Sequence, residues 1–422
     1  LPEDAGNIRY QDLSFKFNFP TEKAGTFSMW GLGLTNRAGA KAKTDSKDWV
    51  YADDNQDDDI RQYTGAMGLS HTYFLKNNAY LKTTLAATAN DLDWTAQKLN
   101  GQLQLQPYSK ITNRNWNFIL SSFVNRKFSA KHTNRTGLLL TGMKYNILLN
   151  KAPNPDSAPQ EIVKAEGQSM LVSAYSSSSV NLTPALLMNV GVNAQIFTLN
   201  NNYTIEPRLG FRQQLNEKHA LGLAYGLHSR LEKLNYYFNN SLATGEKAVN
   251  KNLGFSKAHH FVFGYDWNIS DLVHLKIEPY YQHLFSIPVI KDSSFSFINL
   301  QNDLFFSEKL QNTGRGRNYG IDLMLEKYIS KGYYYLLSAS VFNAEYKGGD
   351  NVWRDTRFNR NYVFNFLIGK EWQMGKDKQN TFSLNTRLSY QGGNRYSPIN
   401  EAASLIAKDV VYDETRAFAI QN

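Results

Sequence analysis

The sequence has no cysteine among its 422 residues and only 11 prolines. The absence of cysteine excludes a disulfide framework and any cysteine-ligated zinc or iron–sulfur site. No run of 18 or more apolar residues occurs, so no segment is predicted to be a transmembrane helix. The chain also does not open on a secretory leader, since residues 1–4 read Leu-Pro-Glu-Asp, and we therefore expect a mature or excised chain.

Positive charge is not concentrated anywhere, although the chain is basic overall. It carries 46 Lys and Arg against 37 Asp and Glu, a formal charge of +9. The basic residues are scattered singly along strand-like segments, as at Lys276 and Arg387, and no zinc-finger or helix-turn-helix pattern is present. We therefore expect no nucleic-acid partner.

Helical periodicity is almost absent, and alternation with a period of two takes its place. In the segment 272–282, Val273, Leu275 and Ile277 fall on one face, and Lys276 and Glu278 fall on the other. The same division recurs along the chain. The predicted strands are 8–19, 26–37, 60–75, 79–90, 113–128, 133–149, 166–181, 185–199, 203–215, 220–235, 259–268, 272–285, 317–329, 333–346, 361–374 and 380–393.

These strands are longer than the five or six residues usual in soluble proteins. Their connections alternate between short turns, such as 76–78 and 330–332, and long polar loops, such as 38–59, 91–112 and 287–313. Aromatic residues lie toward strand ends, as membrane interfaces require. These clusters are Tyr73-Phe74, Tyr80, Tyr236-Tyr237-Phe238, Tyr333-Tyr334-Tyr335 and Trp372. The pattern predicts an all-β fold, a transmembrane antiparallel β-barrel with about 16 strands in this chain. The alternative, a soluble all-β repeat protein, lacks a fixed repeat motif.

Several stretches resemble the barrel of Bacteroidetes TonB-dependent outer-membrane receptors, of the type that carries a carboxypeptidase-regulatory-like domain. Among them is Glu278-Pro279-Tyr280-Tyr281-Gln282-His283, within residues 258–289. Another is Gly392-Gly393-Asn394-Arg395-Tyr396-Ser397-Pro398-Ile399. The remaining stretches are 316–323, 331–337, 352–359 and 412–414. The similarity is strongest over about 255–420 and continues more weakly to the N-terminus.

The resemblance implies a 22-strand barrel around a plug, in which a ligand captured by extracellular loops is imported with energy from TonB. We therefore expect residues 1–422 to be a partial barrel in which the plug and the closing strands are missing. The implied location is the outer membrane of a Gram-negative bacterium. The implied partners are TonB with its inner-membrane energy-coupling complex, reached through the plug, then outer-membrane lipids and lipopolysaccharide, and a surface lipoprotein. A passive porin and a barrel subunit of a larger surface or export complex remain alternatives.

Candidate chemical sites are few. His259 and His260 are adjacent, so in a strand they face opposite sides and cannot chelate one metal together. His228 and His274 fall on polar faces and are expected in the lumen. The acidic loop 53–59 has oxygen ligands at alternate positions, which favours calcium, but it does not fit the helix–loop–helix calcium template.

Five arginines flank two long loops and have two interpretations, a grip on lipopolysaccharide phosphates or another anion, and simple anchoring at the interface. They are Arg315, Arg317, Arg354, Arg357 and Arg360. No nucleophile–base motif occurs, so we expect no enzymatic activity, no catalytic residue, no cofactor and no resident metal. The sequence does not identify the substrate or the residues that bind it.

Overall fold

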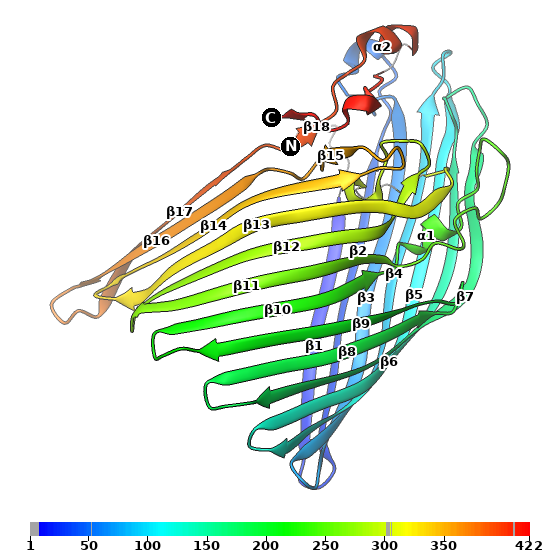
Figure 1. The fold of residues 1–422 in the computed structure, drawn as a ribbon. Coiled ribbons are helices and arrows are strands. Elements are labelled where there is room, and N and C mark those ends of the chain that lie inside the picture. The colour runs from blue at the N-terminus through cyan, green and yellow to red at the C-terminus, as the bar shows by residue number, and fades with distance from the viewer. Residues whose placement is uncertain (1–7, 52, 301–303, 305, 408–409) are drawn as a thin grey trace.

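The computed structural model describes residues 8–51, 53–300, 304, 306–407 and 410–422. It is dominated by one large antiparallel sheet that curls so that its N-terminal strands lie behind its later ones (Figure 1). The strands of the large sheet are β1 (Arg9–Thr21), β2 (Gly25–Ala40), β3 (Gln56–Leu75), β4 (Ala79–Leu99), β5 (Leu105–Ser129), β6 (His132–Lys151), β7 (Gln160–Asn181), β8 (Leu186–Phe197), β9 (Asn202–Gln214), β10 (His219–Arg230), β11 (Ser256–Ser270), β12 (Val273–Ile290), β13 (Leu310–Ser330), β14 (Tyr333–Lys347), β15 (Trp353–Asp355), β16 (Tyr362–Met374) and β17 (Asn380–Gln391).

Smaller elements lie in the long connections. They are η1 (Ser46–Asp48), α1 (Leu234–Tyr237), η2 (Phe297–Asn299), α2 (Glu401–Ala407), η3 (Glu414–Arg416) and a two-stranded sheet of β18 (Arg395–Tyr396) and β19 (Ile420–Gln421).

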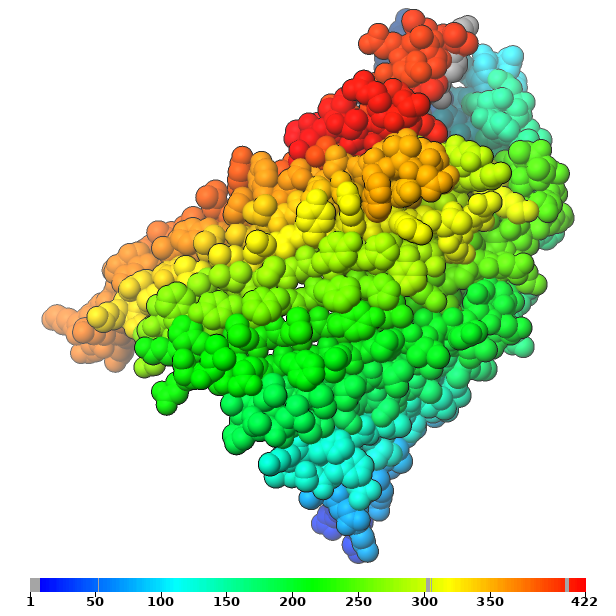
Figure 2. Space-filling view, in the orientation of Figure 1, coloured from blue at the N-terminus to red at the C-terminus, as the bar shows by residue number. Residues whose placement is uncertain are grey.

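The order of strands in the sheet follows the chain. Each strand from β1 to β13 pairs with the next one, and β14 pairs along its length with β16 and near its end with the short β15. Sixteen long strands therefore form eight hairpins, which confirms the predicted number. In Figure 2, β8–β14 form a continuous wall with the C-terminal segment above it.

The two faces of the sheet differ in polarity, as the alternation predicts. The outward face carries exposed apolar side chains, among them Leu69, Leu223 and Leu388, which are 58%, 57% and 65% exposed. Lys276 and Glu278 lie on the opposite face and form an ion pair at 2.8 Å. The sheet curls around that face, which is therefore concave (Figure 1). The connection between β12 and β13 reaches across it and places Phe306 in the same buried cluster as Leu149 of β6. An apolar convex face this extensive requires lipid rather than water around it.

The edges of the sheet are unpaired within the described part of the chain, because β1 pairs only with β2 and β17 only with β16. Every residue of β17 is exposed, and so is every residue of β1 except Phe15. An unpaired edge leaves backbone N–H and C=O groups without partners, which hydrocarbon does not tolerate.

Two predictions from the sequence were wrong in detail. The connection predicted at 91–112 is only residues 100–104, because Leu92 and Trp94 continue the alternation of β4 and Asp93 pairs with Arg114 of β5 at 2.7 Å. The aromatic run at 236–238 does not lie in a membrane girdle, because the predicted strand 220–235 ends at Arg230 and the run folds into a buried loop core.

Candidate functional site

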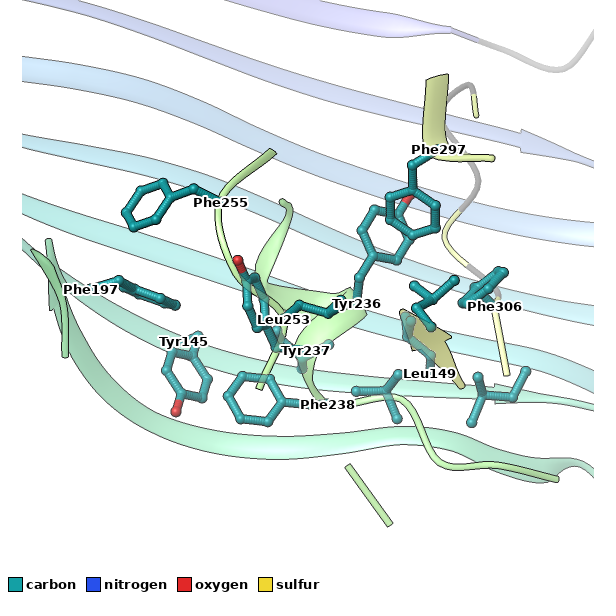
Figure 3. Close-up of a cluster of buried hydrophobic side chains, with 14 of the residues drawn as sticks. Tyr145, Leu149, Phe197, Tyr236, Tyr237, Phe238, Leu253, Phe255, Phe297 and Phe306 are labelled. Carbon is teal, nitrogen blue, oxygen red and sulfur yellow. The ribbon is translucent and has the colours of Figure 1, made fainter. Parts of the chain in front are cut away.

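The long-loop end of the sheet contains an apolar core that joins loops to strands. Figure 3 shows Tyr236, Tyr237 and Phe238 in the middle of this core, with residues of the strands and of the other loops around them. Tyr237 is fully buried, and its ring lies 5.5 Å from that of Phe197 at the end of β8. On the other side, the ring of Tyr236 lies 5.0 Å from that of Phe297 in η2. The loops at this end therefore form a packed layer held by side chains from several strands.

A short hairpin explains why the loop between β10 and β11 folds inward. The β8–β9 hairpin ends at residues 198–201, and β8 pairs with β7 only from Leu171 onward. The loop occupies the vacated edge of β7, where the Asn240 N–H donates to the Ile162 carbonyl at 2.8 Å and Val163 forms a β-bridge with Asn239. Backbone groups of β7 are thus satisfied by a loop instead of a neighbouring strand.

Two cavities lie beneath this layer against the concave face. One of about 450 Å³ is lined by His228, Arg230, Glu232, Lys257, Phe297 and Phe358, among others. The second, of about 530 Å³, is lined by Glu278, Gln282, Asn318, Asp322, Ser340 and Phe358, among others. Phe358, from the connection between β14 and β16, borders both. Charged side chains of both signs share the first cavity with apolar ones such as Leu284 and Leu300, whereas carboxylates, amides and hydroxyls make up most of the lining of the second.

Glu206 on β9 shows how charge is held on the concave wall. Its side chain is 2% exposed and accepts hydrogen bonds from Asn193 Nδ2 at 3.1 Å, Gln195 Nε2 at 2.7 Å and Arg208 at 3.1 Å, and also from the Ser229 hydroxyl. Four donors satisfy this carboxylate, so its role is to fix the wall of the barrel and not to bind a ligand.

The structure places the histidines as the alternation predicts. His259 lies with Tyr225, whose hydroxyl is 3.1 Å from His259 Nδ1, and its ring stacks at 5.0 Å on Phe285. His260 points to the opposite, concave face, where its ring lies 4.8 Å from that of His228. His274 also lies on the concave face, with Nε2 3.3 Å from Asp266.

The five arginines singled out in the sequence do not form one site. Arg317 pairs with Glu345 and stacks on Trp353 at 4.6 Å. Arg354 makes a bidentate contact with Asp350 at 2.7 and 3.0 Å. Arg360 donates to the side chains of Asn394 and Gln391, and Arg315 is exposed. Arg357, the one of the five that lines a cavity described here, has no carboxylate within 4 Å in the described part of the chain.

The acidic loop divides its carboxylates among separate partners. Asp57 pairs with Lys41 at 2.6 Å, Asp58 accepts from Trp94 Nε1 at 2.6 Å, and Asp59 contacts Arg61 at 3.0 Å. The backbone N–H groups of Tyr51 and Val50, together with Lys43, lower the pKa of Asp54 below its usual value. Carboxylates already held in this way are not arranged around a common cation.

No group of three or more His, Asp or Glu side chains among the described residues is placed to hold a metal ion. Within the same residues, no helix is long and apolar enough to cross a membrane.

Comparison with known proteins gives the fold alone. No protein-family profile matches the chain, and no curated protein sequence matches it. Among solved structures, it is similar to Pseudomonas aeruginosa FpvA bound to heterologous pyoverdines, with a TM-score of 0.70 and 12% identity over 95% of this chain and 57% of that one. It is also similar to the ferric-catecholate import receptor Fiu of E. coli, with a TM-score of 0.66 and 13% identity over 93% of this chain and 65% of that one. For the siderophore receptor PiuA of Acinetobacter baumannii the TM-score is 0.67, with 10% identity over 94% of this chain and 66% of that one.

The chain thus spans about three-fifths of the length of these receptors. Its fold is that of outer-membrane β-barrel receptors, which agrees with the predicted fold class and the predicted outer-membrane location. Fiu is an import receptor and PiuA a siderophore receptor, and at 13% and 10% identity the likeness assigns this chain a fold and no role.

Proposed function

We propose that this protein is an outer-membrane receptor of the TonB-dependent kind, which captures a ligand at its long-loop end and imports it with energy supplied by TonB. The observation that carries this proposal is the loop layer itself. It packs across the concave face through Tyr237 and Phe306 and leaves two cavities with charged side chains in their lining beneath it, as a receptor needs and an open pore does not.

The unpaired edges support the proposal that the protein has a larger barrel than the described strands form. In a bilayer the edges at β1 and β17 need partners, so further strands would close the barrel and a plug would fill its concave interior. The polar side chains of that interior, Glu278 and Asp322 among them, would then hydrogen-bond to the plug. Residues 1–422 would be the partial barrel in this arrangement.

The partners follow from the same proposal. TonB and its inner-membrane energy-coupling complex would act through the plug, while outer-membrane lipids and lipopolysaccharide would surround the convex face. A surface lipoprotein could cover the loops, as in a receptor of the Bacteroidetes type that the sequence resembles.

Two measurements on the full protein test the proposal. In planar lipid bilayers the purified receptor should give no steady channel conductance, whereas a passive porin would give stable open steps. In cells, growth on the limiting nutrient that the protein supplies should stop when a protonophore removes the energy source. Stable open steps, or nutrient-dependent growth unaffected by the protonophore, would favour the porin.

A further inference from the structure

A third cavity lies above the concave face, where three distant segments meet. It has a volume of about 390 Å³, and it is formed by the connection between β12 and β13, the connection between β14 and β16, and the C-terminal segment. Its lining includes Asn299, Tyr346, Arg357, Arg395, Glu414 and Phe418. The cavity is separate from the two that lie on the concave wall. Residues of η2 line this cavity and the 450 Å³ cavity but not the 530 Å³ one.

Two buried polar groups in this lining have no hydrogen-bond partner. Tyr346 is fully buried and its hydroxyl is unpartnered, and Asn299 is 7% exposed with an unpartnered Nδ2. The orientation of the Asn299 amide is fixed, because its Oδ1 accepts the backbone N–H of Arg357 at 3.0 Å and only an oxygen can do so. Leaving such donors unsatisfied is costly, so native proteins rarely do it without a reason.

The guanidinium of Arg357 adds a positive charge to these donors, and both favour an anionic group in the cavity. Arg357 is half-buried, and its guanidinium contacts the Asn299 carbonyl at 3.4 Å and lies 5.9 Å from the ring of Phe418. It has no carboxylate partner in the part of the chain that the structure describes. Arg395, by contrast, pairs with Asp355 at 3.0 Å. The carboxylate of Glu414 belongs to an exposed residue of the lining, so it is better screened by water than the guanidinium of Arg357.

We infer that this cavity binds the carboxylate end of a ligand with a flat apolar body. The Tyr346 hydroxyl, the Asn299 amide and the Arg357 guanidinium would donate to the carboxylate oxygens. Phe295 and Phe418 would contact the body of the ligand. The inference names a ligand class for the loop layer and in that respect rests on the proposed function, but binding itself needs neither TonB nor transport.

The test uses benzoate as the probe and benzamide as its neutral match, titrated into the purified full protein in detergent and followed by saturation-transfer NMR. Benzoate should bind at least about tenfold more tightly than benzamide, because hydrogen bonds to a charged group are worth more than neutral ones. Tyr346→Phe removes one oxygen atom and should weaken benzoate about tenfold. Asn299→Asp should abolish the preference for benzoate, since it replaces the donor with a like charge. Glu414→Gln should tighten binding about twofold, since it removes a screened like charge.

Tyr362→Phe is the matched control, because the Tyr362 hydroxyl contacts only Tyr390 in the described chain, at 3.4 Å, away from the cavity. It should leave the affinity unchanged. Equal binding of benzoate and benzamide would overturn the inference. So would a Tyr346→Phe variant that keeps full affinity, since the hydroxyl would then be a water-satisfied group. If the full protein binds benzoate as described but shows no energy-dependent uptake in cells, the result counts against the proposed function only. If it shows energy-dependent uptake but does not prefer benzoate, the result counts against this site only.

Discussion

A charged side chain introduced on the convex face near the middle of a strand should lower the free energy of unfolding far more than the same side chain at the next residue, which faces the concave side. Leu223 of β10 lies on the convex face between Phe211 and Phe263 and is 57% exposed. Ala224, its neighbour, is also exposed but faces the concave side. The two positions lie at almost the same depth, so they differ chiefly in whether lipid or water surrounds them.

The expected magnitudes follow from these surroundings. Leu223→Arg should lower the free energy of unfolding by about 2–4 kcal/mol, the cost of an arginine at the bilayer midplane on the lipid face of a barrel. Replacement of a half-exposed leucine on the surface of a soluble protein would change the free energy of unfolding by only about 0.5 kcal/mol. Ala224→Arg should cost clearly less than Leu223→Arg, because the new side chain enters a hydrated interior.

Reversible unfolding by urea in lipid vesicles, followed by tryptophan fluorescence, measures both variants against the unchanged protein. Comparison requires equal denaturant slopes, which show that the same surface is exposed on unfolding. Equal losses for the two variants, or no loss at Leu223, would refute the assignment of the faces and with it the membrane-spanning arrangement.

Three further predictions concern the loops. Tyr237→Ala should destabilise the loop layer by about 3–5 kcal/mol, because it empties a fully buried aromatic site, and the loop between β10 and β11 should become sensitive to limited proteolysis. Burial raises the pKa of Asp350, but its bidentate contact with Arg354 outweighs burial and sets the pKa below the usual value. The stabilisation is therefore complete above the ordinary aspartate pKa of about 3.9 and lost as the pH falls through the lowered value, which protease resistance of the loop measured against pH will show. Calcium titrated into the protein should give no binding heat at the loop 53–59, because its carboxylates are already held by separate partners.

Each of these has a direct control. Tyr412→Ala removes a tyrosine that is mostly exposed, so it should leave the loop layer intact. Asp350→Asn should flatten the pH profile of proteolysis, and an unchanged profile would show that another group controls it. A saturable calcium signal that Asp57→Asn abolishes would show that the ion pairs of the loop give way to metal.

The sheet was predictable from the sequence because lipid imposes one rule along every strand. Side chains such as Leu275 and Lys276 alternate between hydrocarbon and a wet interior, and a period of two is visible without any tertiary information. The rule fails where polar residues continue a strand beyond the membrane. Asp91 and Asp93 suggested a loop, yet they lie in β4, where a cross-strand pair with Arg114 stabilises the extension.

The loop layer could not be predicted in the same way. The aromatic run Tyr236, Tyr237 and Phe238 follows a strand. The sequence pattern of such a run is the same whether its rings lie at the lipid headgroups or in a core formed by loops. Only the short β8–β9 hairpin decides between the two, since it vacates the space that the run fills. The third cavity is equally hidden, because Asn299 and Arg357 are 58 residues apart and are joined only by tertiary packing.

The directions of the two edge strands restrict what can lie between them. β1 runs from the long-loop end to the turn that leads into β2, whereas β17 leaves the turn after β16 and runs toward the long loops. The two therefore already point in opposite senses, and an antiparallel ladder that bridges them keeps its alternation only if it inserts an even number of strands. A seam filled by one strand, or by three, would force a parallel pair into an otherwise antiparallel cylinder.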